Sequence, residues 1–588
     1  MISNKQTNIL AFCLLFLMFL MALFSMAGDS LTMDEQSHLP AGYSYLTQKD
    51  MRINPEHPPL IKDLAAFPLL FIKGINFPSE TPGWKDEVNG QWTYGSAFLF
   101  SSGNPADEMI FWGRLPMILM LMLLGLFIFK WSRELYGNQA ALLALFLFSF
   151  SPTFIAHGRL VTTDVGAATG VLIASYYFVK FLKDSSSKNI IFAGLALGFA
   201  ELTKFSLILL VPTFVILFIF WAAVKSKGGF LNFLKVFGKY LLFFILILAV
   251  AGVLIWAIYQ YNVWNYPPER QAQDTQSLLR TTPFPIVRNV LVWVAEQPVI
   301  RPLAHYFLGL AMVFERASGG HTMYFLGEVS NVGWKNYFPF VYIVKEPLAM
   351  HLLTIIALFF AVLALKPSFP QPWLKFKNWA QKYIAQLALF LFFLIYWAFT
   401  LKSNLNLGVR HLLPILPIVY ILVSGAIIAL MKPPHQKVKY SLLAVVLIWQ
   451  AFTVVSIYPS FLSYFNEIVG GPSKGYLYSV DSNYDWGQDL KRLVQWTEKN
   501  KIDKIYVDYF GGASAKYYLK DKFQFWAGDK NPKELPPGSY LAISASPLQI
   551  GQGLPGKGFD LKFGYYGWLN QYEPVARIGY SIFVYRIN

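Results

Sequence analysis

The segment Ile9–Ala27, ILAFCLLFLMFLMALFSMA, runs almost directly into Thr32–Pro40, TMDEQSHLP, and this junction decides the fold. A membrane-spanning helix needs about 20 predominantly apolar residues, so the first segment is long enough to cross a bilayer. It is long and lacks a convincing small-x-small cleavage site, and we interpret it as a retained helix rather than a signal peptide. The chain therefore leaves a membrane and at once presents an acidic pair, Asp34 and Glu35.

The composition of the whole chain supports this interpretation. The 588 residues are 55% hydrophobic and only 14% charged, whereas soluble proteins carry roughly 25% charged residues. Because a charge placed in hydrocarbon is costly, the deficit indicates an integral membrane protein. The net charge of +16 comes mostly from short clusters between apolar runs, so we do not expect nucleic acid as a partner. A single cysteine, Cys13, leaves no internal disulfide.

About eleven apolar stretches predict a mainly α-helical, polytopic membrane protein. They cover residues 9–27, 109–130, 138–154, 164–182, 189–203, 205–224, 239–260, 345–365, 382–401, 411–431 and 440–458. The third and the fifth are short for a span. Lysine-rich loops alternate with loops that hold few cations, and the lysine-rich side is expected to be cytoplasmic. The N-terminus is then inside, and an odd number of spans places the C-terminus outside.

Three long segments share the expected external face, namely residues 28–108, 261–344 and 459–588. The first two are rich in aromatic residues and proline, which is typical of amphipathic helices in the membrane interface. The third combines an amphipathic helix after Asp485 with strand-like segments, so it predicts an external α/β domain. We therefore divide the chain into a membrane module, 1–458, and an external domain, 459–588. Within that domain, Pro536–Gly538 indicates a turn that would expose Ser539.

The acidic pair has a structural and a chemical interpretation. Thr32 and Glu35 form a capping-box pattern that would start a helix just outside the membrane. Alternatively, Asp34 could accept a proton from an acceptor hydroxyl while nearby cations hold a phosphate. The cations that follow are Arg52, His57 and Lys62. Asp34 and His38, four residues apart on one helical face, could instead bind a divalent metal.

A second acid lies in HGRLVTTDVGA, His157–Ala167, at the expected outer end of a span. Asp164 there could simply cap the helix that follows. Arg159 close by would make another pairing of a cation with an acid at the same membrane level.

Taken together, these motifs and several others resemble the GT-C superfamily of glycosyltransferases, in the branch of the protein O-mannosyltransferases and the aminoarabinose transferases. The resemblance lies in Asp34-Glu35, the turn His57-Pro58-Pro59, GRLVTTD, GLALGFAELTKFS (Gly194–Ser206), FLGEVSNVGWKNYFPFVYIVKEP (Phe325–Pro347), LNLGVRHLLPILP (Leu405–Pro417) and SVDSNYDWGQDL (Ser479–Leu490). These enzymes take a sugar from a polyprenyl-phosphate carrier. The external tail does not clearly match a tail of either group, which leaves the acceptor open.

The resemblance implies roles for individual residues. Asp34 would be the catalytic base, with Glu35 beside it, and Asp164 the second acid. Lys204 and Arg410 would hold the carrier phosphate, and both stand on the side that is otherwise poor in cations.

The other candidates carry less specific signals. His57, Lys62 and Arg159 are further candidates for the phosphate, and Glu328 and His38 could contact an acceptor or satisfy a loop. The tail acids Asp481, Asp485 and Asp489 are expected to cap and solvate the tail helix rather than to bind calcium.

We therefore expect an inverting glycosyltransferase of a prokaryotic plasma membrane, acting at the outer face on a polyprenyl-phosphate sugar. The acceptor could be a protein hydroxyl, a glycolipid or a glycan. A nucleotide is not expected, since a GxxxxGK[ST] sequence and a Gly-rich βαβ unit are absent, and no cofactor is predicted apart from the metal alternative. A transporter or flippase of a lipid-linked sugar, or a non-catalytic assembly subunit, stays open as an alternative.

Overall fold

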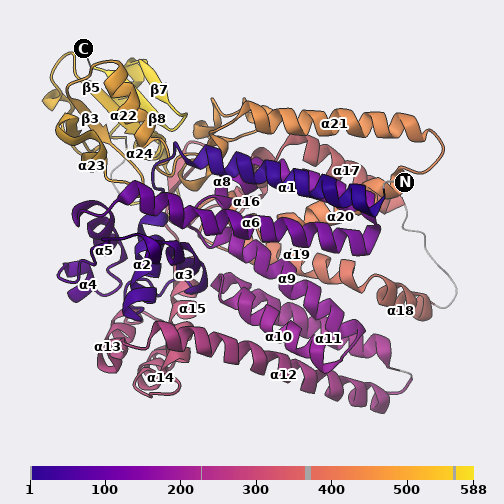
Figure 1. Cartoon of the computed structure of the whole chain (residues 1–588). Helices are drawn as coiled ribbons and strands as arrows, with labels where there is room; N and C mark the ends of the chain where they lie inside the picture. Colours follow the sequence, from indigo (N-terminus) through magenta and orange to yellow (C-terminus); the bar gives the residue numbers. More distant parts are fainter. Residues whose placement is uncertain (1–2, 227, 364–371, 561–563, 588) are drawn as a thin grey trace.

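The computed structural model describes residues 3–226, 228–363, 372–560 and 564–587. Long helices run side by side through the middle of the molecule, and the N- and C-termini lie at opposite ends of this bundle (Figure 1). Among the described residues, six helical segments are long and apolar enough to cross a membrane. They are α1 (Asn4–Met26), α6 (Ala106–Tyr136), α9 (Asp164–Lys183), α11 (Leu210–Lys225) with the short helix η3 (Phe205–Leu209) before it, α12 (Phe230–Asn262) and α21 (Gln436–Ser456).

Three further apolar stretches form bent pairs of helices. The pairs are α7 (Asn138–Ser149) with α8 (Pro152–Gly158), α16 (Tyr337–Lys345) with α17 (Leu348–Leu363), and α18 (Pro372–Lys382) with α19 (Ile384–Thr400). Their bends are 63°, 110° and 83°. The stretches expected near 189–203 and 411–431 form the 15-residue helices α10 (Ser187–Glu201) and α20 (Leu416–Leu430). Each expected span is thus represented by helix, and the polytopic helical fold is confirmed.

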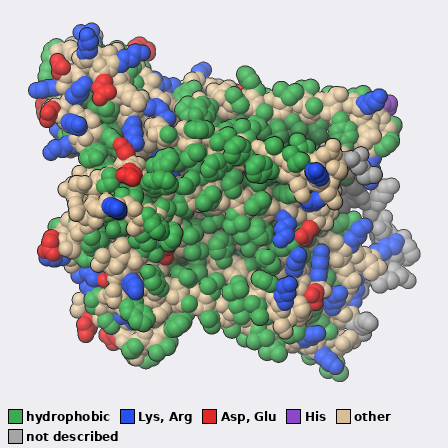
Figure 2. Space-filling model, viewed as in Figure 1, with side chains coloured by type: hydrophobic (Ala, Val, Ile, Leu, Met, Phe, Trp, Pro, Cys, Tyr) green, Lys and Arg blue, Asp and Glu red, His purple; other side chains and the backbone are tan. Residues whose placement is uncertain are grey.

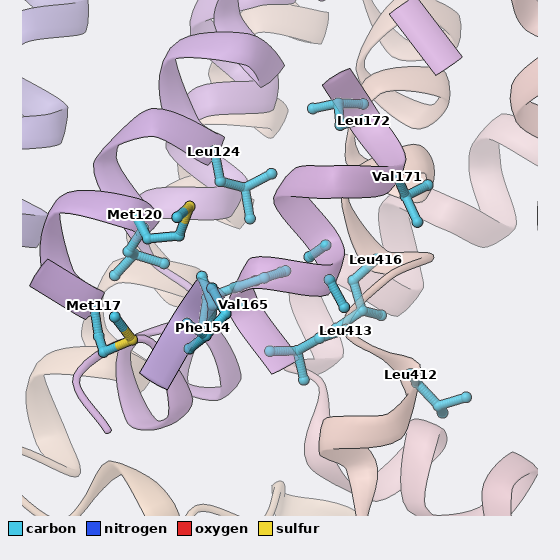
Figure 3. Packing of buried hydrophobic residues seen from close by; sticks show 14 of the residues in the cluster. Met117, Met120, Leu124, Phe154, Val165, Val171, Leu172, Leu412, Leu413 and Leu416 are labelled. Atoms are coloured by element: carbon cyan, nitrogen blue, oxygen red, sulfur yellow. The ribbon is translucent and has the colours of Figure 1, made fainter. Parts of the chain in front are cut away.

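Hydrophobic side chains cover the middle of the bundle as a broad band (Figure 2). Lysine and arginine gather at the end near the N-terminus, whereas the opposite end carries both signs of charge. Inside the bundle, apolar side chains from α6, α8, α9 and the start of α20 interlock (Figure 3). This core includes Met120, Phe154, Val165 and Leu413, each at most 7% exposed. Val165 and Leu413 lie close in sequence to Asp164 and Arg410, so tight packing supports the polar groups discussed below.

Short helices gather at the end of the bundle that also carries the C-terminal sheet (Figure 1). They are α2 (Glu35–Gln48), α3 (Leu60–Ala66), α4 (Pro82–Lys85), α5 (Gln91–Ser96), α13 (Pro268–Leu278), α14 (Pro285–Ala295) and α15 (Arg301–Gly319). On α14 the apolar residues Ile286, Val290 and Trp293 are more than half exposed, as in a helix whose apolar face lies in a membrane interface.

The tail contains a five-stranded sheet in the order β4-β3-β5-β8-β7. The strands are β3 (Ile505–Asp508), β4 (Phe523–Phe525), β5 (Tyr540–Ser544), β7 (Ala576–Ile578) and β8 (Ile582–Arg586). The helices around it are α22 (Leu490–Lys499), α23 (Ala515–Leu519) and α24 (Ala545–Gln552). The β3 strand pairs in parallel with β4 and β5, and β8 is antiparallel to β5 and β7.

A second small sheet joins the tail to the external segment before α16. Its strands are β1 (Met323–Phe325), β2 (Glu328–Ser330) and β6 (Leu554–Pro555). Ser539 was expected to be exposed, but its hydroxyl oxygen is buried. The reason is that the chain turns into β5 directly after it, so the exposed part of the turn ends at Gly538.

Candidate active site

Four charged side chains from distant parts of the chain meet at the end of the bundle that carries the short helices. Asp34 directly precedes α2, and Asp164 is the first residue of α9. Lys204 follows α10, and Arg410 lies in the short helix η4 (Val409–Leu412) just before α20. Helix starts and tight turns hold all four, so the bundle fixes their relative positions.

The four groups alternate in sign along a chain of ion pairs. Arg410 Nη1 lies 2.6 Å from Asp34 Oδ2 and 3.6 Å from Asp164 Oδ2. Lys204 Nζ donates a hydrogen bond of 2.5 Å to Asp164 Oδ1. Buried charges are tolerated when they are paired in this way, and the two acids balance the two cations.

The two carboxylates differ in how far solvent can reach them. The side chain of Asp34 is 23% exposed, whereas that of Asp164 is 0% exposed. Asp34 is therefore the acid that a ligand in the cavity can approach. Asp164 contacts the two cations from the buried side.

Three of these groups, Asp34, Lys204 and Arg410, line one cavity whose walls differ in polarity. Its polar wall also includes His38, His57 and His411. The apolar wall includes Phe205 and Leu209 from η3, Leu310 and Phe314 from α15, and Phe399 from α19. A charged group with an apolar tail fits such a cavity, since each part meets a wall of its own kind.

The charge state of the polar wall follows from the pKa shifts. Burial by itself would raise the pKa of Asp34, but the Arg410 guanidinium and His38 together hold that pKa below its ordinary value. Burial lowers the pKa of His38 and moves that of His57 well below its ordinary value. At pH 7, Asp34 is thus ionised and His57 is neutral, so His57 would offer a hydrogen bond rather than a charge.

The capping interpretation of Asp34 has little support in the local geometry. Helix α2 begins at Glu35, and the Asp34 side chain makes no capping hydrogen bond. Half of the expected capping box is present, because Thr32 N donates to Glu35 Oε2 at 2.8 Å. The Asp34 carboxylate instead points across the site to Arg410.

Four of the sequence candidates lie away from the cavity. Glu35 is fully buried and forms an ion pair of 2.6 Å with Arg114. Lys62 is also buried, and its ammonium donates to the carbonyl oxygens of Asn54 and His57, so it braces the HPP turn from behind. Both charges hold the surrounding loops in place and do not line the cavity.

Arg159 and Glu328 are the other two. Arg159 is 1% exposed and pairs with Asp29 at 2.8 Å. Glu328 is exposed on β2 and accepts a hydrogen bond of 3.1 Å from Trp334 Nε1. The structure therefore does not bring Arg159 or Glu328 to the cluster of four charges.

The tail acids do not solvate their helix as expected. Asp485 is fully buried and accepts from Ser546 N at 2.8 Å, and Asp489 is buried against Ser581. The two side chains thus link the segment before α22 to α24 and to the turn between β7 and β8. The expectation of solvated caps is wrong because this segment packs between the sheet and the membrane module.

Some residues of the cavity had escaped the sequence analysis. His411 lines the cavity and directly follows Arg410 in the sequence GVRHL. This adjacency to Arg410 was the one sign of its position. Arg316 on α15 pairs with Glu56 at 2.5 Å, and both line the cavity. Nothing in the sequence connects two residues that lie 260 positions apart.

The two residues of the metal alternative, Asp34 and His38, each have another partner. Across residues 3–587, apart from the short gaps in the description, no group of three or more His, Cys, Asp or Glu is arranged for a metal. Asp34 pairs with Arg410, and the Nδ1 atom of His38 lies 2.9 Å from the carbonyl oxygen of Val161. The geometry favours cationic side chains as the partners of Asp34.

The fold is that of a polytopic membrane protein with a paired cluster of charges at one end of its helix bundle. The sequence model of the family described as dolichyl-phosphate-mannose-protein mannosyltransferase matches residues 106–256, about a quarter of the chain. This region contains Asp164 and Lys204. A comparison with curated proteins gave no match.

Several solved structures are similar to this chain at low sequence identity. The Pmt1-Pmt2 protein O-mannosyltransferase complex of Saccharomyces cerevisiae, bound to its sugar donor, is 11% identical with a TM-score of 0.51, over 78% of this chain and 90% of that chain. ArnT of Cupriavidus metallidurans, bound to undecaprenyl phosphate, is 12% identical with a TM-score of 0.45, over 99% and 98%. AglB of Archaeoglobus fulgidus, with an inhibitory peptide and dolichol phosphate, is 10% identical with a TM-score of 0.47, over 91% and 69%. The family match and the yeast fold confirm the resemblance to GT-C glycosyltransferases.

Proposed function

We propose that the protein is an inverting glycosyltransferase that moves a sugar from a polyprenyl phosphate to an acceptor hydroxyl. One observation carries this proposal: an accessible carboxylate, Asp34, lies beside two cations in a cavity that also has an apolar wall. A base, a phosphate site and a lipid site are the three features that such a reaction needs. The yeast structure with the same fold is bound to a sugar donor, which supports the choice of substrate class.

The donor is expected to bind with its phosphate against Lys204 and Arg410. Hydrogen bonds between cationic donors and phosphate oxygens are about twice as strong as neutral ones. The prenyl chain would run along Phe205, Leu209 and Phe314, which belong to the apolar wall of the cavity. The sugar then lies at the level of Asp34.

The transfer is a single displacement. Asp34 takes the proton of the acceptor hydroxyl, and the oxygen forms a bond with the anomeric carbon from the face opposite the phosphate. The bond between that carbon and the phosphate oxygen breaks, and the electron pair leaves with the polyprenyl phosphate. Lys204 and Arg410 stabilise the charge that develops there. The anomeric configuration is inverted.

Donor binding would also activate the base. Arg410 pairs with Asp34, which keeps the pKa of the carboxyl low and makes it a weak base. A bound phosphate competes for Arg410, so the hold on Asp34 weakens and its basicity rises. Asp164 retains both cations through the exchange, because it contacts Lys204 and Arg410 from the buried side.

A transfer assay separates this proposal from its alternatives. Purified protein would be incubated in vesicles with a radiolabelled polyprenyl-phosphate sugar and a panel of peptide, glycolipid and glycan acceptors. The proposal expects label on an acceptor. Label that only crosses the bilayer would indicate a flippase, and donor left unchanged on either side would favour an assembly subunit.

The pH dependence of the reaction tests the identity of the base. Because the pKa of Asp34 is depressed, the carboxylate form is present above its ordinary pKa and is lost only as the pH falls below that range. The acid limb of kcat/KM should therefore lie below about pH 4. A limb centred near pH 6.5, where free histidine titrates, would assign the base to a histidine instead.

The orientation in the membrane is a further prediction. We place the end with the active site outside the plasma membrane of a prokaryote, because the opposite end gathers lysine and arginine (Figure 2). A cysteine introduced at the exposed Lys533, in a Cys13→Ala background, should react with an impermeant maleimide in intact cells. Labelling that requires lysis would reverse the topology.

A further inference from the structure

The tail segment 479–490, SVDSNYDWGQDL, packs against the loops that carry Asp34 and Arg410, although it follows α21 in the chain. Its Trp486 is 1% exposed. The Trp486 ring lies edge-on to the ring of His157 on α8, with 6.1 Å between the ring centroids. Trp526, another buried tryptophan of the tail, packs in a core around the five-stranded sheet. Trp486 therefore contacts the membrane module directly.

The segment holds the loop that carries Asp34. The carbonyl oxygens of Trp486 and Gln488 accept hydrogen bonds from the backbone nitrogens of Met33 and Ser30, at 3.1 Å and 2.9 Å. Lys491 N donates to Ser30 Oγ at 2.7 Å. The residues just before Asp34 thus form hydrogen bonds with the tail backbone, which fix the position of the Asp34 backbone.

The same segment holds the loop that carries Arg410. Asn483 Oδ1 accepts from Val409 N at 2.8 Å, and the Ser482 hydroxyl donates to the carbonyl oxygen of Leu407. Gly408 between them has φ +135°, and a Cβ there would collide with Ser482 Oγ. Only glycine lets the two segments approach so closely.

The Trp486 ring also contacts the catalytic cation itself. The guanidinium carbon of Arg410 lies 4.4 Å from the ring centroid, while Nη1 of the same group pairs with Asp34. A cation–π contact attracts the charge without a directed bond. The guanidinium can therefore move across the ring from Asp34 to a phosphate without losing this partner.

We propose that segment 479–490 is a positioning element of the active site, in which Trp486 supports Arg410 as it passes from Asp34 to the donor phosphate. Asn483 and the backbone of Trp486 and Gln488 fix the loops of the two catalytic groups relative to each other. This inference rests on the proposed function, and it gives the tail a part in binding the donor.

Binding of undecaprenyl phosphate to purified protein in detergent tests the proposal. Trp486→Leu removes the π face and should weaken binding by about 5- to 30-fold, the scale of a desolvated cation–π contact. Trp486→Phe keeps an aromatic face and should recover most of the affinity. Trp526→Leu is the matched control, and it should lower the melting temperature of the tail while leaving the affinity unchanged.

A double-mutant cycle distinguishes support of Arg410 from general stability. If Trp486 acts through Arg410, then Trp486→Leu should have little further effect on affinity in an Arg410→Gln background. Equal effects in both backgrounds, or equal losses in Trp486→Leu and Trp526→Leu, would overturn the inference and leave the proposed function standing. A parent protein that does not bind undecaprenyl phosphate would overturn both.

Discussion

Asp34→Asn is expected to fold and to bind the donor, but to transfer sugar at least about a hundredfold more slowly than the parent. The amide has the size of the carboxylate and can still accept a hydrogen bond from Arg410, so the local structure should survive. It cannot take up the acceptor proton, and general-base assistance is worth roughly 10²–10⁴ in rate. The measurement is single-turnover transfer of label from a saturating donor, together with the donor dissociation constant.

The control for this variant is an acid on the same face but outside the cavity. Asp86 is exposed at the end of α4, and Asp86→Asn should transfer at the parental rate. Glu35→Gln is unsuitable as a silent control, because it leaves the buried Arg114 without its partner, a loss that costs about 3–5 kcal/mol. Near-parental turnover of Asp34→Asn would remove Asp34 from the chemistry.

Neutralising the two cations should have the second largest effect, and on donor binding. A charge-assisted hydrogen bond to phosphate contributes about 1.5–3 kcal/mol, so Arg410→Gln or Lys204→Gln should raise the donor dissociation constant by about 10- to 150-fold. Each single variant leaves the buried Asp164 paired with the other cation, which limits the structural cost. Calorimetric titration with the donor would measure the change.

Arg280 offers a matched control for the cations, since it is an exposed arginine just after α13 on the same face. Arg280→Gln should bind the donor with parental affinity. If all three variants bind alike, Lys204 and Arg410 only anchor the ends of their helices and the phosphate binds elsewhere.

The sequence identified the four charged residues but not their pairing. Asp34 and Asp164 lie at the starts of α2 and α9. Lys204 and Arg410 stand out because they lie on a face with few other cations. Which acid contacts which cation depends on the packing of α9 against α10 and on where η4 lies, because Asp34 and Arg410 are 376 positions apart. Local patterns carry no information on contacts of that range.

Charges with structural roles are indistinguishable from functional ones in sequence. Lys62 lies just after the HPP turn, where the sequence suggested a phosphate ligand. Its ammonium instead donates to oxygens of the protein, among them the carbonyl oxygens of Asn54 and His57. Trp486 shows the converse, since a tryptophan in a motif gives no sign that its ring lies against Arg410. Both roles are set by tertiary contacts.

Apolar stretches predicted the helices better than their shape. The bends in α7–α8 and α16–α17 occur where a proline follows, at Pro152 and Pro347. Proline disfavours helix in the residue before it and removes a backbone donor, so a continuous apolar run can contain a sharp turn. Hydropathy counts length and composition, and it does not detect this.

The most direct test is an experimental structure of the protein with an intact polyprenyl-phosphate sugar and the Asp34→Asn substitution to prevent turnover. We expect phosphate oxygens within hydrogen-bond distance of Lys204 and Arg410 and the prenyl chain along Phe205 and Phe314. We also expect residue 34 on the face of the anomeric carbon opposite the phosphate. A headgroup bound near the middle of the bilayer, or a phosphate that contacts neither cation, would contradict the proposed function.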